Sequence, residues 1–96
     1  MVWPILLVAG KDDQLWPSAR MAEDLMRRRE AGGGHPGDQM MIYPDAGHLI
    51  GKAYLPSGST RIGRGRLETG GSPAGNARAQ AYAWRRVLAF LGMAWD

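Results

Sequence analysis

The sequence predicts an α/β fold of two parallel strands and two helices, in the order strand, helix, strand, long loop, helix. Three observations predict this fold class. Short apolar runs at residues 3–9 and 39–43 are each followed by turn-forming residues. An amphipathic segment lies between these runs, and a longer amphipathic segment closes the chain.

The first run, Trp3 to Ala9, is continuously apolar rather than alternating. Such a run is typical of a strand that is buried on both faces, as in a parallel sheet covered by helices. Gly10 ends it. No basic region precedes the run, and it is too short for a signal-peptide core. We interpret Met1 as a truncation point, an artificial start or a misassigned start, because a strand follows it at once.

The second element is a helix that begins at Pro17 and Ser18 and stops at the glycine run 32–34. Acidic residues lie early in it and arginines lie late, an order that suits the helix dipole. Its predicted apolar face is formed by residues at helical spacing, namely Ala22, Leu25 and Met26, with Met21 beside them.

The third element is a second short strand, Gln39 to Tyr43. A strand–helix–strand unit makes a right-handed crossover, which places its two strands parallel. The carboxyl ends of both strands then lie at one edge of the sheet, where open α/β folds bind their ligands. Asp12, Asp13 and His48 are therefore expected on the same side of the molecule.

The remainder is predicted to be a loop and a helix. Residues 51–71 are rich in Gly, Ser, Pro and Arg and show no periodicity, so we expect a long surface loop of the kind that often has a function. Ser72 and Pro73 are typical of a helix start. The apolar face predicted for this last helix steps by four and three residues, through Ala77, Ala81, Trp84, Leu88, Leu91 and Trp95.

Composition narrows the class of protein. The chain has 96 residues, 45% hydrophobic and 22% charged, which indicates one small ordered domain. It has no cysteine, which excludes disulfides and thiolate sites and suits the cytoplasm. The longest apolar run is far shorter than the roughly 20 residues of a membrane-spanning helix, so no membrane partner is expected. No basic stripe interleaved with aromatic residues is present, and nucleic acid is not expected as a partner.

The strand pattern also predicts incomplete burial. Two parallel strands need neighbours on both sides, and here both outer edges would be open. We therefore interpret residues 1–96 as a single partial domain and expect self-association through the strand edges.

The chain has a net charge of +3, with arginines grouped at 27–29 and at 61, 64 and 66. These groups have two interpretations: solvated surface, or attraction to a polyanion.

His48 is the strongest candidate for acid–base chemistry. It follows a predicted strand end and Gly47, which permits a tight backbone turn. A histidine acts as a general base when a carboxylate on its other ring nitrogen fixes the tautomer. Asp12 and Asp13 are candidates for that carboxylate, and Asp38 and Asp45 are also available. Asp12, Asp13 and Asp45 have the alternative role of turn residues.

No nucleophile or metal site completes this pair. The elbow motif G-x-S-x-G places a serine on a strained turn, and none of Ser18, Ser57, Ser59 and Ser72 has that spacing. In α/β-hydrolases the order is nucleophile, acid, histidine, so a nucleophile would precede Met1. The two histidines and the aspartates show no recognised metal-ligand spacing, and no metal is expected.

Three segments resemble one enzyme family over nearly the whole chain. They are P-I-L-L-V-A-G-K-D-D-Q-L-W-P-S, Y-P-D-A-G-H-L-I and G-G-S-P-A-G-N-A-R-A-Q-A-Y-A-W-R-R-V-L-A-F-L. Together they resemble the C-terminal part of the acyl-CoA thioesterase and bile-acid-CoA:amino-acid N-acyltransferase family, whose members are α/β-hydrolases of fatty acid metabolism. The resemblance implies a C-terminal fragment of an α/β-hydrolase fold.

The resemblance also implies roles for individual residues. Asp13 would be the triad acid and His48 the triad base, while Gly10, Asp12 and Gly47 would support the turns. The substrate would be an acyl-CoA thioester, with coenzyme A as part of the substrate and no other cofactor. The loop arginines Arg61, Arg64 and Arg66 would then be candidates for contacts with coenzyme A phosphates.

The resemblance further implies a limit on activity. The family's nucleophile, serine in thioesterases and cysteine in acyltransferases, has no counterpart in the chain. We therefore expect the chain to be inactive alone. The alternative hypothesis is a non-catalytic module, derived from a truncated hydrolase, that self-associates or binds an anionic partner.

Overall fold

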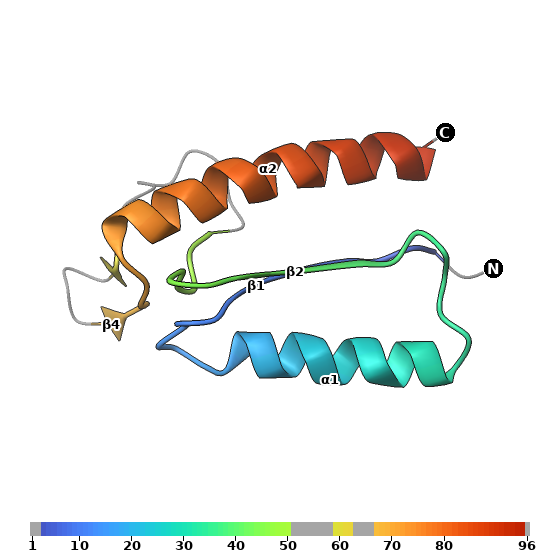
Figure 1. The fold of residues 1–96 in the computed structure, drawn as a ribbon, viewed down its shortest axis with the longest axis horizontal. Coiled ribbons are helices and arrows are strands. Elements are labelled where there is room, and N and C mark those ends of the chain that lie inside the picture. Colours follow the sequence, from blue (N-terminus) through green and yellow to red (C-terminus); the bar gives the residue numbers. More distant parts are fainter. Residues whose placement is uncertain (1–2, 51–58, 63–66, 96) are drawn as a thin grey trace.

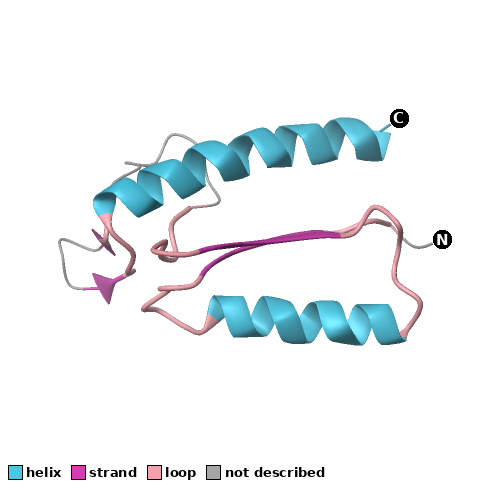
Figure 2. Cartoon of the chain, in the orientation of Figure 1, coloured by secondary structure: helices cyan, strands magenta, loops and turns pink. Residues whose placement is uncertain are grey.

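The computed structural model describes residues 3–50, 59–62 and 67–95. The elements in chain order are β1 (Leu6–Gly10), α1 (Ser18–Ala31), β2 (Gln39–Tyr43), β3 (Arg61–Ile62), β4 (Leu67–Glu68) and α2 (Pro73–Trp95). They form three layers, with the sheet of β1 and β2 between α1 and α2 (Figure 1). Figure 2 shows the same layers by type of secondary structure.

The sheet of β1 and β2 is parallel, with Leu6 opposite Gln39 and Gly10 opposite Tyr43. The predicted strand–helix–strand unit is therefore confirmed, although β1 begins at Leu6 rather than at Trp3. Ala9 and Gly10 are buried, whereas residues 6–8 are only partly buried. Helices cover both faces of the sheet, as predicted, but residues 6–8 are less buried than predicted, because in the described part of the chain β1 has a neighbouring strand on one side only.

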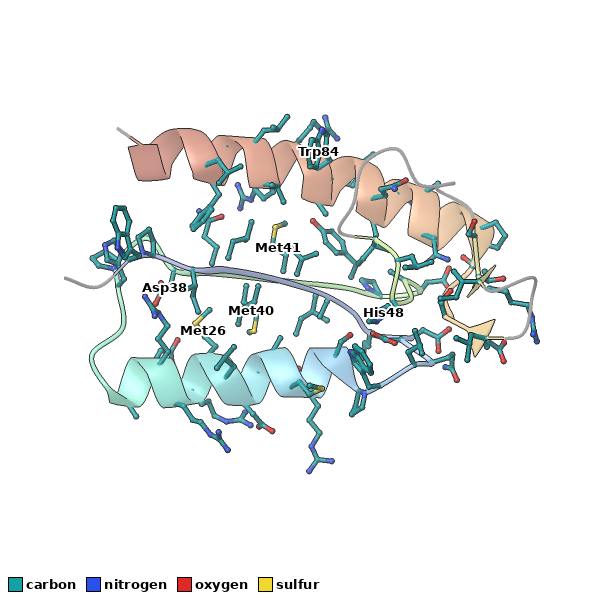
Figure 3. The ribbon with its side chains drawn as sticks, turned by 180° about the vertical axis from the view of Figure 1, so that it is seen from behind. Met26, Asp38, Met40, Met41, His48 and Trp84 are labelled. Carbon is teal, nitrogen blue, oxygen red and sulfur yellow. The ribbon has the colours of Figure 1, made fainter. Side chains whose placement is uncertain are left out.

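Helix α1 begins at Ser18, as predicted, and packs on one face of the sheet. Ala22 and Met26 are buried there, and Met26 and Met40 lie between α1 and the sheet while Met41 lies on the side of α2 (Figure 3). The rest of the predicted apolar face is wrong, because Met21 and Leu25 are about half exposed. Both flank the edge of β1 that β2 does not cover, where they line a groove of about 460 Å³.

Helix α2 begins as its sequence predicts, but it presents a different face to the sheet. The Ser72 hydroxyl accepts the Gly75 N–H at 3.0 Å. Leu88 and Leu91 of the predicted face are about half exposed, and the side chain of Trp95 lies outside the described part. The buried face has the same four-and-three spacing displaced by one residue, about 100° around the helix, and contains Asn76, Gln80 and Ala83 together with Gly75 and Ala79.

The displacement of the α2 face has a steric reason. Ala79 packs in a small core with Ala46 and Ile50, against Val8 and Tyr43. A β-carbon at Gly75 would overlap the Asp45 carbonyl oxygen, so the helix face that contains Gly75 and Ala79 lies directly against the turn that follows β2. The periodicity of α2 therefore predicted the helix correctly, but the predicted apolar face is displaced by one residue from the face that is buried.

The predicted loop at residues 51–71 contains structure that its composition did not indicate. Strands β3 and β4 form a short antiparallel hairpin, with Arg61 opposite Glu68. Gly70 and Gly71 then form bridges to Asp13 and Ala46. Strands of two residues leave no periodicity, which is why the sequence showed only a loop. Residues 51–58 and 63–66 of this prediction, including Arg64 and Arg66, lie outside the described residues.

The turns that follow β1 and β2 are in direct contact. The Lys11 N–H donates to the Tyr43 carbonyl and the Asp12 N–H to the Ala46 carbonyl, both at 2.9 Å. A β-carbon at Gly10 would overlap the carbonyl oxygens of Ala46 and Gly47. Gly10 is therefore required by the close approach of the two turns.

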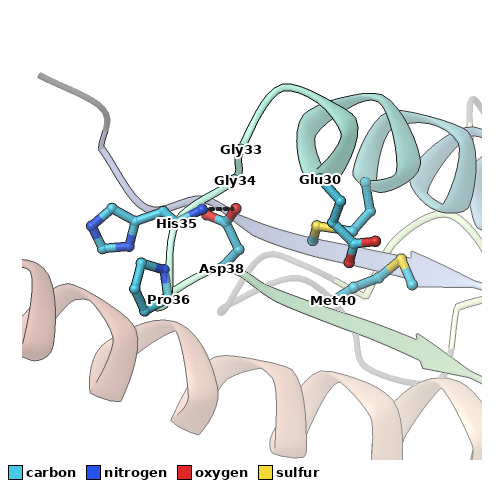
Figure 4. A pocket seen from close by; sticks show the side chains of 8 residues that line it. Glu30, Gly33, Gly34, His35, Pro36, Asp38 and Met40 are labelled. Carbon is cyan, nitrogen blue, oxygen red and sulfur yellow. Dashed lines mark hydrogen bonds between the residues drawn. The ribbon is translucent and has the colours of Figure 1, made fainter.

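A carboxylate fixes the opposite end of the sheet. The Asp38 side chain is 8% exposed and accepts a hydrogen bond from Arg29 Nε at 2.6 Å. It also accepts the N–H groups of Ile5 at 2.9 Å and His35 at 3.0 Å, the second drawn in Figure 4. The hydrogen bond from Arg29 is the main cause that holds the pKa of Asp38 below its usual value. One side chain thus joins the start of β1, the end of α1 and the loop before β2.

We expect Gly10→Ala to lower the free energy of unfolding by about 1–3 kcal/mol, the usual cost of an extra methyl group in a packed site. Gly92→Ala is the matched control, because a β-carbon there meets no atom within 4 Å. It is expected to raise the free energy of unfolding by about 0.5–1 kcal/mol. Urea titrations followed by circular dichroism measure both changes, and a Gly10→Ala variant as stable as the wild type would contradict the contact between the turns.

We expect Asp38→Asn to lower the melting temperature by several degrees at pH 7, because the amide cannot replace the charged acceptor. The folded-state pKa of Asp38 is lowered, so its stabilisation is complete above the unfolded pKa of about 4 and is lost as the pH falls further. The difference from wild type should therefore close in acid. Asp24→Asn, which removes a solvent-exposed partner of Arg27, is the control and should change little. A difference that persists unchanged at low pH would contradict this role of Asp38.

Candidate active site

Asp13 and His48 are side by side at the carboxyl edge of the sheet. His48 Nδ1 lies 2.9 Å from Asp13 Oδ2, across 35 residues of sequence. The Asp13 side chain is 2% exposed and that of His48 is 26% exposed. Figure 3 shows His48 at the end of the sheet opposite Asp38. Of the four aspartates that the sequence left as candidates, the structure places Asp13 against the imidazole.

Asp13 is held as a carboxylate. Its Oδ1 accepts the backbone N–H groups of Leu15 at 2.9 Å and Trp16 at 3.2 Å. Burial alone would raise the pKa of Asp13, but hydrogen bonds from His48, from the Ser18 hydroxyl and from these two N–H groups outweigh it and lower the pKa. The Ser18 hydroxyl also lies 3.3 Å from the Gly10 carbonyl, and its single proton serves one acceptor at a time.

The ionised acid fixes the tautomer of the histidine. A carboxylate only accepts hydrogen bonds, so Nδ1 of His48 is the donor in this pair. In the neutral ring Nε2 then carries the free electron pair. A ring in this state can take a proton from a hydroxyl or thiol, and the resulting imidazolium is stabilised by Asp13. The arrangement is therefore that of a general base with its orienting acid.

The other aspartates have different partners. Asp12 accepts the Gly71 N–H at 2.9 Å and the Gln14 side-chain amide at 2.7 Å. Asp45 has a positive φ of 59° and accepts a hydrogen bond from the Ser72 hydroxyl. Asp38 lies at the far end of the sheet, beside a pocket of about 520 Å³ (Figure 4). That pocket is remote from His48 and is not part of this site.

The segment Thr69–Gly71, here called the 69–71 strap, lies between the turn that carries Asp13 and the turn that carries His48. The Thr69 carbonyl accepts the His48 N–H at 2.8 Å and the Gln14 N–H at 3.3 Å. Gly70 and Gly71 have positive φ values of 89° and 76°. The strap was not predicted from the sequence, in which the adjacent glycines are the one signal that indicates it.

Asn76 is a second residue that the sequence analysis missed. It is 1% exposed. Its Oδ1 accepts the Gly47 N–H at 2.8 Å, and its Nδ2 donates to the carbonyls of Ser59 at 2.9 Å and Gly70 at 3.0 Å. A β-carbon at Gly47 would overlap the carbonyl oxygens of Thr69 and Gly70. Gly47 and Asn76 therefore fix the backbone that immediately precedes His48.

Trp16 is the third missed residue and the one that touches the imidazole. Its ring centroid lies 4.8 Å from that of His48, and the two ring planes are perpendicular. In the sequence, Trp16 is recognisable only as part of a family motif. No periodic pattern could identify this contact, because both residues lie in turns.

The remaining candidates are less closely tied to the site. Arg61 is exposed and lies 3.8 Å from Glu68 across the β3–β4 hairpin. Among the serines that the structure describes, none has a hydrogen bond to His48. Within residues 3–50, 59–62 and 67–95, no three histidine or acidic side chains gather as metal ligands.

No helix in the described part has both the length and the apolar character needed to cross a membrane.

The matching family model and similar known proteins point to the same family. Residues 2–95 match the family model described as "BAAT / Acyl-CoA thioester hydrolase C terminal". The chain is 32% identical over 91 residues to acyl-coenzyme A thioesterase 6 of Homo sapiens, covering 92% of the chain and 21% of the relative. It is 34% identical over 92 residues to the peroxisomal succinyl-coenzyme A thioesterase of Mus musculus, covering 93% and 22%.

A relative with a different named activity matches equally well. The chain is 36% identical over 91 residues to acyl-coenzyme A amino acid N-acyltransferase 2 of Rattus norvegicus, covering 91% of the chain and 21% of the relative. The chain thus spans about a fifth of the length of these curated relatives. Because the family model covers nearly all of the chain, the protein belongs to the BAAT and acyl-CoA thioester hydrolase family, in the part described as its C terminal.

Proposed function

We propose that this chain supplies the acid and the base for attack on the carbonyl of an acyl-CoA thioester. The observation that carries the proposal is the 2.9 Å hydrogen bond between the buried, ionised Asp13 and His48 Nδ1. The names of the relatives supply the substrate class, since both the thioesterases and the N-acyltransferase act on acyl-coenzyme A.

The proposed steps follow from the tautomer. His48 Nε2 takes the proton of a serine hydroxyl or cysteine thiol as that nucleophile attacks the thioester carbonyl, and Asp13 stabilises the imidazolium. The C–S bond breaks, the imidazolium returns its proton to the departing coenzyme A thiolate, and an acyl-enzyme remains. Water or an amino acid amine then attacks the acyl group as His48 takes its proton; the bond between the acyl group and the nucleophile breaks, and His48 returns the proton to the nucleophile.

The nucleophile is not expected within these 96 residues. The chain has no cysteine, and no serine stands in a G-x-S-x-G motif. We therefore propose that the chain alone is inactive. Contact of Arg61, Arg64 and Arg66 with coenzyme A phosphates belongs to the same proposal, and for Arg61 it has to compete with Glu68. We also propose a cytoplasmic location for this chain, although some relatives are named peroxisomal or mitochondrial.

The triad role can be tested in a chimera in which this chain replaces the matching fifth of the mouse succinyl-coenzyme A thioesterase. We expect the chimera to release coenzyme A from succinyl-CoA, and His48→Ala or Asp13→Asn to reduce kcat by roughly 10³–10⁴-fold. Asp24→Asn, which removes the half-exposed partner of Arg27 on α1, is the control with unchanged rate. A chimera whose rate is the same with and without His48 would contradict the triad role.

The chain alone should show no release of coenzyme A above the rate in buffer. Hydrolysis by the chain alone that disappears in His48→Ala would contradict the proposed inactivity, and would place a nucleophile inside the 96 residues. This outcome leaves the role of His48 intact, so the two parts of the proposal can fail separately.

We propose self-association as a second function, and the free edge of β1 favours it. In a parallel pair alternate residues bond to the neighbour, so the backbone groups of Leu6 and Val8 face away from β2, toward the side where the described chain has no strand. The apolar groove beside this edge is lined by Met21 and Leu25, both about half exposed. An open strand edge with an apolar border is a template for pairing with a second copy.

We expect the mean mass in light scattering to rise with concentration, and Met21→Lys or Leu25→Lys to restore the monomer. Leu88→Lys, an equally exposed apolar residue on α2, is the control that should leave association unchanged. A monomeric wild type at high concentration would contradict self-association. Dissociation by Leu88→Lys alone would place the interface on α2 instead of β1.

A further inference from the structure

We propose that Trp16 is a positioning residue for His48. Its indole ring keeps the imidazole in the plane in which Nδ1 donates to Asp13, and it limits the access of water to that hydrogen bond. The proposal rests on the proposed function, because it assigns a further residue to the same acid–base pair.

The first argument is the geometry of the two rings. The centroids of Trp16 and His48 are 4.8 Å apart and the ring planes are perpendicular. This edge-to-face arrangement is one that aromatic pairs prefer. The hydrogen bond to Asp13 fixes one atom of the imidazole. A ring held at one atom can still rotate about its side-chain bonds, and contact with a second ring removes that freedom.

The second argument is that Trp16 is fixed by the same carboxylate. The Trp16 N–H donates to Asp13 Oδ1 at 3.2 Å, while His48 Nδ1 lies against Asp13 Oδ2. The Trp16 carbonyl accepts the Ser18 N–H at 2.7 Å where α1 begins. Asp13 thus contacts both residues, and its hydrogen bond to the Trp16 backbone holds this residue beside the imidazole that its indole contacts.

The third argument is exposure. Trp16 is 52% exposed, so its contribution to the core is small for so large a side chain. His48 is 26% exposed, so water can compete for its hydrogen bond unless a neighbour covers it. The one ring contact found for Trp16 in the described part of the chain is with His48. A role in aligning and covering the imidazole accounts for an aromatic side chain at this half-exposed position.

Solution NMR of the full chain labelled with ¹⁵N-histidine tests the proposal without any activity assay. The chain has two histidines. His35 Nδ1 accepts the Gly37 N–H at 2.8 Å, so its neutral ring carries the proton on Nε2, whereas that of His48 carries it on Nδ1. The ¹⁵N shifts therefore separate the two rings, and His35 serves as an internal reference in every variant.

The variants are Trp16→Leu, which removes the aromatic ring, and Trp16→Phe, which keeps one. We expect the His48 Nδ1–H to exchange with water about three- to tenfold faster in Trp16→Leu, the factor that an aromatic pair contributes to an opening equilibrium. Trp16→Phe should keep most of the protection, and His35 should not change. The slowest backbone amides of β1 and β2, measured in the same sample, normalise the exchange rate for any loss of global stability.

An unchanged normalised exchange rate in Trp16→Leu would overturn the proposal, and equal losses in Trp16→Leu and Trp16→Phe would show that the edge-to-face contact is not the cause. Asp13→Asn separates this proposal from the function on which it rests. If Asp13→Asn abolishes the protected Nδ1–H and Trp16→Leu leaves its normalised exchange rate unchanged, only the role of Trp16 fails. If Asp13→Asn also leaves the signal unchanged, the acid–base pair itself is wrong.

Discussion

The hydrogen bond between Asp13 and His48 depends on the close approach of three backbone segments that are far apart in the sequence. The turn after β1 carries the acid, the turn after β2 carries the base, and the 69–71 strap bonds to both. These contacts join peptide N–H and carbonyl groups directly, so the segments have no room for side chains at Gly10, Gly47 and Gly70. The geometry of the acid–base pair is thus a consequence of backbone packing rather than of the two side chains alone.

The chemistry of the pair follows from the environment of one carboxylate. Burial opposes ionisation of Asp13, and the hydrogen bonds it accepts from His48, Ser18 and two backbone N–H groups overcome that effect. An ionised acceptor assigns the proton of the neutral imidazole to Nδ1 and leaves Nε2 free. The turn that begins at Asp13 therefore determines both where the acid lies and which nitrogen of His48 can act as base.

The same close packing explains how apolar side chains are distributed. The backbone of α2 approaches the sheet through alanines, and the core at that contact contains Ala46, Ile50 and Ala79. Larger apolar residues, such as Met21 and Leu25 on α1 and Leu88 and Leu91 on α2, are about half exposed. A single chain with two strands has too little sheet surface to bury them. These exposed apolar surfaces are the places where another polypeptide chain would bind.

The sequence by itself determined the parts of this protein that depend on local patterns. The two strands, the helix starts at Ser18 and Pro73, the glycine stop after α1 and the candidacy of Asp13 and His48 all follow from residue type and short-range spacing. Family membership also follows, because it is a comparison of sequences. Only the tertiary structure decided which face of α2 is buried, that residues 69–71 form a strap, and that Asn76 binds the backbone next to His48 while the Trp16 ring contacts the imidazole. These features depend on contacts between residues 29 to 59 positions apart or on turns without periodicity, and the interactions across such distances leave no repeating signal in the chain.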